Sequence, residues 1–220
     1  MQWIERHAAH RSNAVITLTE SAIDELDRRY AGVVSHKAQV VTTCADLDRF
    51  TLSELPRKPT RILLAGTLNR YYDVLSMLDI VAELRRRGIV ELIVASPSDT
   101  EWEEAFTVAD AQRVSVAPGE MADLVSSCHA GLSVCSNDAG TSLLAAMPTK
   151  IGEFLACGRP VVVNPGLVDV VEMLERDGCG VAFEASLPTG VVEAVDRLEH
   201  LLEDPGTPRR CRALAESHFD

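Results

Sequence analysis

Short apolar runs rich in β-branched residues alternate with amphipathic stretches along most of the chain. Residues 61–66 (RILLAG) are almost continuously apolar, which suits a strand buried on both faces of a parallel sheet. Residues 73–88 follow with apolar side chains at helical spacing, and Gly88 stands where that helix should end. The same pattern predicts further strands at 14–19, 38–43, 90–96, 112–117, 130–135, 159–164 and 180–184.

Helical stretches separate most of these strands. They are expected at 21–30, 99–110, 119–128, 149–157 and 191–204. Strands that alternate with helices form right-handed crossovers and a parallel sheet with helices on both faces. The predicted fold class is therefore α/β, with a Rossmann-like parallel sheet.

Residues 51–60 (TLSELPRKPT) interrupt this alternation, because they are polar, contain two prolines and show no periodicity. We interpret them as an interdomain linker, with residues 61–220 as one domain and residues 1–50 as an appendage. Since the sequence begins inside a predicted helix and ends without a helix terminator, we expect residues 1–50 to be the remnant of a larger N-terminal domain.

Composition narrows the function classes. Hydrophobic residues make up 46% and charged residues 25%, which is ordinary for a globular protein, and the net charge of −12 argues against nucleic-acid binding. The six cysteines are scattered without a Cys-x-x-Cys pair, which indicates reduced thiols and no metal site. Without a long apolar run or a signal-peptide core, the expected location is the cytoplasm.

The most informative stretch is 148–163 (PTKIGEFLACGRPVVV), which predicts a helix between Pro148 and Gly158 and then a strand. Lys150 falls in the first turn, where the helix dipole disfavours a cation. The free N–H groups of that turn can bind an anion, and a bound phosphate would make Lys150 favourable. Glu153 lies one turn further on and could accept hydrogen bonds from ribose, so the pair suggests a nucleotide. Alternatively, the two residues form an exposed ion pair that contributes only a few tenths of a kcal/mol.

Three predicted strand ends also carry glycine and small polar residues, and ligands of open α/β sheets bind outside the carboxyl ends of strands. These loops are 65–73, 135–142 and 164–169. The pattern is common in α/β proteins.

His129, which precedes a strand, is interpreted as structural.

Three segments together resemble the C-terminal domain of GT-B glycosyltransferases, and glycosyltransferase family 4 is the most similar type. They are ILLAGTLNRYYD, VSVAPGEMADLVSSCHAGLSVC and PTKIGEFLACGRPVVV. NAVITLTESAIDELDRRY and AQVVTTCADLDRF resemble the end of the N-terminal domain and the crossover between the domains. The resemblance extends over about residues 3–216 and is most specific in 148–163.

The resemblance implies a retaining transferase that uses a nucleotide-diphospho sugar and needs no metal or other cofactor. Glu153 matches the second glutamate of the family's Glu-x7-Glu motif, which typically holds the ribose, whereas the first glutamate falls at Ala145. Some relatives instead carry Pro-x-Lys-x-x-Glu. Pro148, Lys150 and Glu153 match it, and the lysine there is placed for the diphosphate.

The family's Gly-Arg-Leu…Lys-Gly loop is altered in this chain. Gly66 and Leu68 match it, but Thr67 replaces the arginine, and Tyr72 and Asp73 stand in place of Lys-Gly. Arg70 is the nearest basic residue and either substitutes for the lost cations or remains a solvated loop charge. The candidate donor-binding residues are therefore Gly66, Arg70, Ser142, Thr149, Lys150 and Glu153.

No catalytic residue is assigned, because the family carries its acceptor site and much of its catalytic apparatus on the N-terminal domain. We expect this chain alone to bind the nucleotide sugar and to transfer it poorly or not at all. The acceptor is expected to be a saccharide, a lipid-linked molecule or another small molecule. Any peripheral membrane contact would come from the absent part of that domain. Exposed strand edges around 14–19 should promote self-association.

Two other readings of the sequence remain open. One is a doubly wound nucleotide-binding or regulatory domain without catalytic activity. The other is a nucleotide-sugar epimerase, which shares the GT-B fold, although its histidine and arginine constellation is not evident. Binding of UDP, GDP or ADP that depends on Lys150 would favour the transferase.

Overall fold

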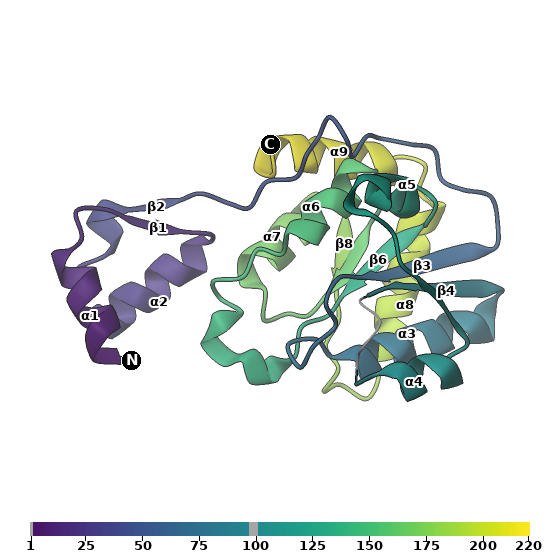
Figure 1. Ribbon diagram of the computed structural model, residues 1–220, viewed down its shortest axis with the longest axis horizontal. Helices are drawn as coiled ribbons and strands as arrows, with labels where there is room; N and C mark the ends of the chain where they lie inside the picture. Colours follow the sequence, from purple (N-terminus) through teal and green to yellow (C-terminus); the bar gives the residue numbers. More distant parts are fainter. Residues whose placement is uncertain (1, 97–100) are drawn as a thin grey trace.

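The computed structural model describes residues 2–96 and 101–220, arranged as a large lobe with a small lobe beside it (Figure 1). The large lobe contains a six-stranded parallel sheet in the order β5-β4-β3-β6-β7-β8. The predicted α/β class with a Rossmann-like parallel sheet is confirmed. Its strands are β3 (Thr60–Ala65), β4 (Val90–Ala95), β5 (Ala111–Val114), β6 (Ala130–Ser133), β7 (Val161–Val163) and β8 (Gly180–Ala182).

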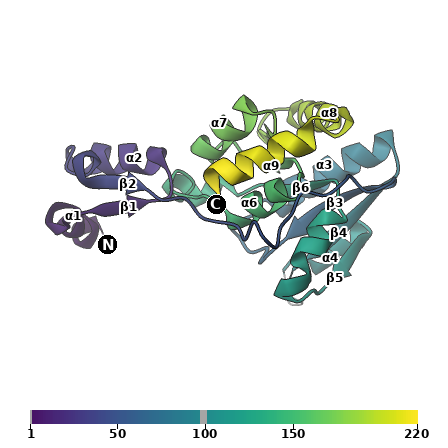
Figure 2. The same ribbon diagram turned by 90° about the horizontal axis from the view of Figure 1, so that it is seen from above.

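Both faces of this sheet are covered by helices, as Figure 2 shows from above. Successive residues of β3 point to opposite faces: Ile62 and Leu64 join one apolar cluster, and Leu63 and Ala65 join the other. The first cluster lies under α3 (Val74–Arg87), α4 (Glu103–Val108) and α8 (Gly190–Glu203). The second lies under α5 (Met121–Ser126), α6 (Thr149–Ala156), α7 (Val168–Arg176) and α9 (Thr207–His218). Burial on both faces explains why the strands are almost continuously apolar.

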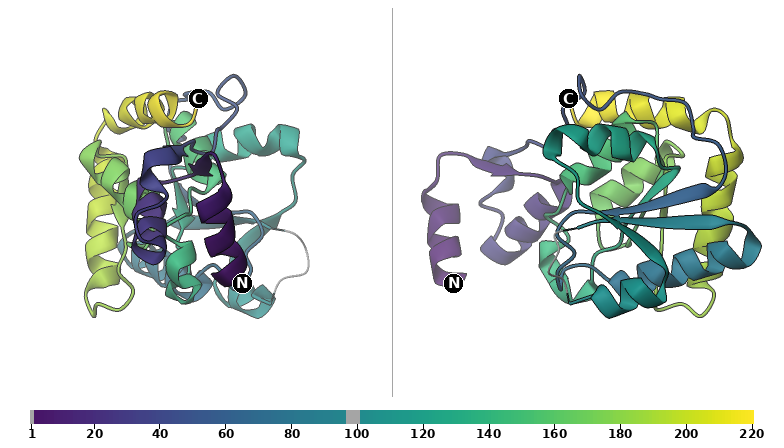
Figure 3. Two further views of the ribbon diagram at one scale, coloured as in Figure 1. Left: turned by 90° about the vertical axis from the view of Figure 1, so that its left-hand side faces the viewer. Right: turned by 45° about the vertical axis from the view of Figure 1, so that its right-hand side comes forward.

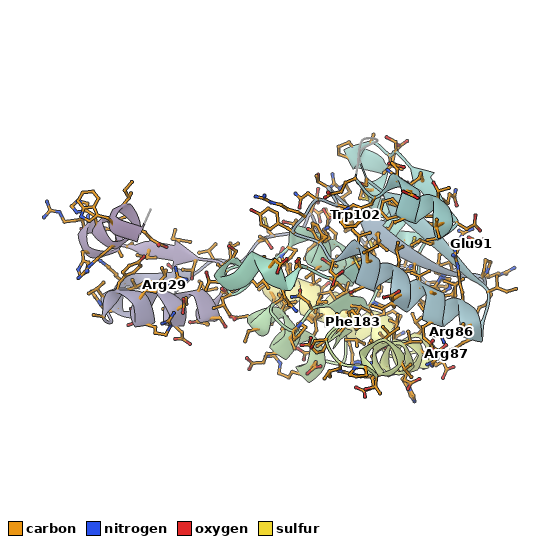
Figure 4. The ribbon with its side chains drawn as sticks, turned by 90° about the horizontal axis from the view of Figure 1, so that it is seen from below. Arg29, Arg86, Arg87, Glu91, Trp102 and Phe183 are labelled. Atoms are coloured by element: carbon orange, nitrogen blue, oxygen red, sulfur yellow. The ribbon has the colours of Figure 1, made fainter. Side chains whose placement is uncertain are left out.

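Charged side chains join the two long helices of the first face. Arg87 of α3 donates hydrogen bonds to Glu83 on its own helix, and to Asp196 and Glu199 on α8. Figure 4 shows Arg86 and Arg87 at this end of the large lobe, far from Arg29 in the small lobe. These ion pairs are partly exposed and therefore contribute little energy, so the apolar cluster between α3 and α8 is the main contact of the two helices.

The strand order reverses direction between β3 and β6. The chain moves outward from β3 to β4 and β5, and then returns to place β6 on the other side of β3. The loops that follow β3 and β6 therefore leave the sheet side by side and diverge. In open α/β sheets this topological switch point is where ligands bind.

The small lobe contains its own two-stranded parallel sheet, separate from the large one (Figure 3). Strand β1 (Val15–Thr17) pairs with β2 (Ala38–Val40), next to α1 (Gln2–Arg11), α2 (Glu20–Tyr30) and the 3₁₀ turn Ser35–Lys37. Ile16 of β1 is 70% exposed. The division of the chain into residues 1–50, 51–60 and 61–220 stays a prediction, and so does self-association.

Residues 41–59 have no regular structure but are held firmly on the large lobe. Phe50 is completely buried in the second apolar cluster. Arg159, also completely buried, donates hydrogen bonds to the Ser53 carbonyl and hydroxyl and to the Glu54 carbonyl. Arg212 of α9 donates to the Phe50 carbonyl at 2.7 Å. Residues 41–59 therefore form a fixed strap on the large lobe.

Each predicted strand and helix is present within the described residues, and the strands other than β3 are shorter than predicted. Residues 99 and 100 of the helix predicted at 99–110 lie outside the described residues. Two helices, α7 and α9, were not predicted. Gly166 and Pro165 before α7 favoured a loop, and α9 follows Pro205, Gly206 and a proline at its second position, which hid its start. Among the described residues, no helix is long and apolar enough to cross a membrane.

The strap should be part of the folding unit of the large lobe. Replacing Phe50 by alanine removes a fully buried ring and leaves a cavity, so we expect the free energy of unfolding to fall by about 3–5 kcal/mol. Urea denaturation would measure this. Leu75→Ala, at a position on α3 that is 56% exposed, serves as the control and should cost far less. Equal costs for the two variants would show that the strap is a loose tether.

Candidate active site

The loops after β3 and β6 are joined at the switch point by backbone contacts. The Ser136 N–H donates to the Tyr71 carbonyl at 2.7 Å, and the Asp73 N–H donates to the Val134 carbonyl at 3.0 Å. Tyr72 and Cys135 form an isolated antiparallel bridge between the same loops. Asn164, buried after β7, accepts a hydrogen bond from the Cys135 N–H at 3.1 Å. Three of the strand ends that carry small polar residues therefore meet in one place.

Helix α6 reaches this place because it is pressed tightly onto the sheet. A Cβ atom on Gly131 of β6 would lie 2.4 Å from the Phe154 ring, so only glycine lets the helix approach so closely. Ile151, Phe154 and Leu155 are buried, as the sequence predicted, and Gly158 adopts a left-handed conformation (φ +78°) just after the helix. The close fit aims the first turn of α6 at the end of β3.

Lys150, in that first turn, extends to the carboxyl end of β3. Its Nζ donates to the Ala65 carbonyl at 2.6 Å and lies 4.1 Å from the centre of the Tyr72 ring. A Cβ atom on Gly66 would lie 3.0 Å from this Nζ, and Gly66 has a φ of +103°, which other residues rarely adopt. The structure thus brings Gly66 and Lys150 together.

The surroundings of Lys150 disfavour its charge. Burial lowers the pKa of Lys150 from 10.5 to about 8, because one carbonyl and the face of a ring replace the water around the ammonium. Pro148 stands at the N-cap and provides no side-chain acceptor for the first N–H groups of α6. A partly desolvated cation beside an uncapped helix start is chemically suited to an anionic ligand.

Glu153 lies one turn further along α6 and is half-buried. Burial raises the pKa of its carboxyl group, and the nearby cations Arg49 and Lys150 act in the opposite direction. No ion pair joins Lys150 and Glu153 in the part of the chain that the structure describes, and Lys150 binds the Ala65 carbonyl instead. The alternative of an exposed Lys150–Glu153 pair is therefore wrong.

The other predicted donor-binding residues are exposed and more dispersed. Thr149 is the first residue of α6, next to Lys150. Arg70 lies over the Tyr71 ring, 5.6 Å from its centre, which leaves its guanidinium facing solvent. Ser142 ends the 3₁₀ segment Asn137–Ser142 and lines a cavity of about 500 Å³ between the two lobes. Donor binding by all six residues stays a prediction.

Histidine and cysteine chemistry does not contribute to this site. His129 is buried and its Nδ1 accepts the Arg61 N–H at 3.0 Å, which confirms a structural role. Cys135 is close to Lys150, but burial raises the pKa of its thiol, so it is a weak nucleophile. All six cysteines are free, and five of them are buried. Within residues 2–96 and 101–220, no three His, Cys, Asp or Glu side chains come together to hold a metal.

Two residues of this region were not identified from the sequence as site residues. Tyr72 was noted as a replacement in the altered family loop, and the structure places its ring against the Lys150 ammonium. Arg49 brings a second cation to Glu153 from the strap. Its position could not be inferred, because it depends on how residues 41–50 fold back onto α6.

Comparison with protein families gives one match that covers more than half of the chain. The model described as glycosyl transferase-like matches residues 76–219, from α3 to the end of α9. The chain belongs to the glycosyl transferase-like family. This confirms the resemblance on which the donor-site residues were chosen, while the assignment to family 4 stays a prediction.

Solved glycosyltransferase structures share the fold of this family member at low sequence identity. WaaG, a glycosyltransferase involved in lipopolysaccharide biosynthesis, is 14% identical with a TM-score of 0.68 and covers 92% of this chain. Sucrose-phosphate synthase from Thermosynechococcus elongatus is 13% identical with a TM-score of 0.76 and covers all of it. HepE from Anabaena, in complex with UDP, is 13% identical with a TM-score of 0.73. These structures confirm the architecture of a GT-B glycosyltransferase half.

The glycosyl transferase-like chain spans only part of those proteins. It covers 58% of WaaG, 57% of the sucrose-phosphate synthase and 64% of HepE. Comparison with curated proteins gave no significant match.

The environment of Lys150 predicts how stability should depend on pH. With a pKa near 8 in the folded chain and 10.5 as its ordinary value, the unfolded state binds more protons between these pH values. The wild-type protein should therefore gain stability, relative to Lys150→Met, as the pH rises through this window. Urea denaturation at about pH 7.5 and about pH 9.5 would measure the difference. Lys58→Met is the control, because it removes an exposed lysine. The prediction would be contradicted if the wild type lost stability relative to Lys150→Met as the pH rises.

Proposed function

We propose that this chain is the donor-binding half of a glycosyltransferase that transfers a sugar from a nucleotide-diphospho sugar. The observation that carries the proposal is the position of the Lys150 ammonium. It lies at the topological switch point, in the uncapped first turn of α6, beside a glycine whose missing side chain leaves room for the ammonium. This is where an α/β sheet binds ligands, and where a diphosphate would relieve the unfavourable surroundings of the lysine.

The diphosphate would bind Lys150 and the first N–H groups of α6, taking the place of the Ala65 carbonyl as the partner of Nζ. The loop at Gly66 would allow it to approach the backbone, and Thr149, Arg70 and Ser142 would surround it. Glu153 lies one turn deeper and would accept hydrogen bonds from the ribose hydroxyls. Its nearness to Arg49 favours the ionised carboxylate, which is the better acceptor.

The stereochemical course and the acceptor belong to the same proposal. The family resemblance supports retention of configuration at the anomeric carbon, without a metal. The acceptor would be a saccharide, a lipid-linked molecule or another small molecule. UDP is the first nucleotide to test, since HepE was crystallised with UDP and also with UDP-glucose.

Calorimetry with matched variants would test the two roles separately. Lys150→Met removes a hydrogen bond between charged groups, so the affinity for UDP, GDP or ADP should fall about ten- to a hundredfold. The affinity for the corresponding nucleosides should not change. Glu153→Gln should weaken nucleosides and nucleotides alike, because it weakens the acceptor for the ribose.

Lys58→Met is the matched control, because Lys58 is exposed and lies before β3, at the opposite end of the strand from Gly66. Equal losses for Lys150→Met and Glu153→Gln with every ligand would show that α6 is merely structural. If no nucleotide binds the wild-type chain, the proposal fails and a domain without transferase activity becomes the better interpretation.

A further inference from the structure

The cavity of about 500 Å³ has one wall from each lobe. Thr17, Leu18, Ala22 and Leu26 of the small lobe face Thr141, Ser142, Leu144 and Ala145 of the large lobe. Its width depends on where the small lobe lies, because neither lobe closes it alone. Ser142 is also one of the candidate donor-binding residues, so the cavity and the candidate donor site share a residue.

Away from the strap, polar contacts at the start of α2 connect the lobes. Asp169 Oδ2 accepts the Glu20 N–H at 2.7 Å, and Asp169 Oδ1 accepts the Ser21 N–H at 3.2 Å. The Thr19 hydroxyl donates to the Leu144 carbonyl at 2.5 Å and itself accepts the Ala22 N–H. The two carboxylate contacts span 149 and 148 residues of sequence.

Asp169 is well suited to this contact for an electrostatic reason. It belongs to the first turn of α7, and it also accepts both of the first two N–H groups of α2. The carboxylate therefore lies at the positive ends of two helices, one from each lobe, and each favours a negative charge there. It also satisfies N–H groups that would otherwise have no partner in α2. A carboxylate that served α7 alone would not need to reach the start of α2.

We propose that Asp169 is a positioning residue that holds the small lobe at a fixed angle over the donor half. The carboxylate acts through α2: it fixes the start of that helix, and α2 in turn forms the small-lobe wall of the cavity. The functional meaning of this angle rests on the proposed transferase activity, because an acceptor seated in the cavity must meet the donor at α6. Asp169 itself touches no reacting group.

Two variants would break the contact from opposite sides. Asp169→Asn preserves the shape of the side chain but replaces one acceptor by an NH₂ group that faces N–H donors. Glu20→Pro removes the Glu20 N–H from the small lobe. Proline is tolerated at the first position of a helix, and Thr19 before it is already extended (φ −146°, ψ 153°), as a residue before proline should be. Asp123→Asn, in the exposed first turn of α5, is the matched control.

Pulsed electron paramagnetic resonance on the full chain would measure the lobe separation. Spin labels at Asp24→Cys on α2 and Asp79→Cys on α3, in a Cys44→Ser background, report the distance between exposed positions of the two lobes. We expect one narrow distribution for the wild type and for Asp123→Asn. In Asp169→Asn the ratio of molecules at the wild-type distance to molecules at other distances should fall roughly tenfold or more. In Glu20→Pro the same ratio should fall by less.

The double variant should change the distribution no more than Asp169→Asn does, because both changes act on one contact. UDP affinity should stay within about twofold of the wild type in each variant, since among the described residues Asp169 is hydrogen-bonded to α2 and not to Lys150 or Glu153. A distribution unchanged by Asp169→Asn would overturn the proposal. A changed distribution in a chain that does not bind UDP would keep the contact but overturn its link to transfer, and would count against the proposed function itself.

Discussion

The structure depends on the fact that a parallel sheet must be covered on both faces. Helices on each side leave only the ends of the strands open to solvent, and polar groups of the loops gather there. The chain turns outward from β3 and then returns to β6, so two of these loops separate at the centre of the sheet. At this point the covered sheet presents backbone and polar side chains to a ligand. Gly66 and Lys150 meet there.

Two buried cations on the α6 side of the sheet are treated in opposite ways. Arg159 is completely buried, and its guanidinium donates to the carbonyls of Ser53, Glu54 and Ser126. An arginine stays charged in proteins, so its N–H groups keep donating hydrogen bonds to the strap at any ordinary pH. Lys150 has a single carbonyl partner and an aromatic face, and burial lowers its pKa. Arg159 thus has several acceptors supplied by the fold, although its Nε has none, whereas Lys150 has a single acceptor and a ligand could supply more.

The elements of the large lobe could be predicted because each carries its own periodicity. The run at 61–66 and the spacing at 73–88 identify a buried strand and a helix without any tertiary information. Helix α9 could not be recognised in the same way, because proline and glycine mark its start as a loop. Lys150 was identifiable because it conflicts with the helix dipole, and such a local conflict is visible in sequence. Its partner, the Ala65 carbonyl, belongs to the backbone and leaves no trace in the sequence.

The strap connects the small lobe physically with the candidate site. Residues 41–50 enter from the small lobe, bury Phe50 under α9 and place Arg49 close to Glu153. The segment that tethers the small lobe is thus also part of the electrostatic environment of Glu153. At the other side of the molecule, Asp169 fixes the start of α2. Both sides carry more than one contact, because Thr19 also donates to the Leu144 carbonyl, and Thr42 and Thr43 donate to the His218 and Met147 carbonyls. A rotation of the small lobe must therefore break the contacts at Asp169 and Thr19 or those near residues 41–44. Because Phe50 and Arg159 anchor the strap beyond that point, such a rotation would alter the cavity between the lobes and leave the environment of Lys150 unchanged.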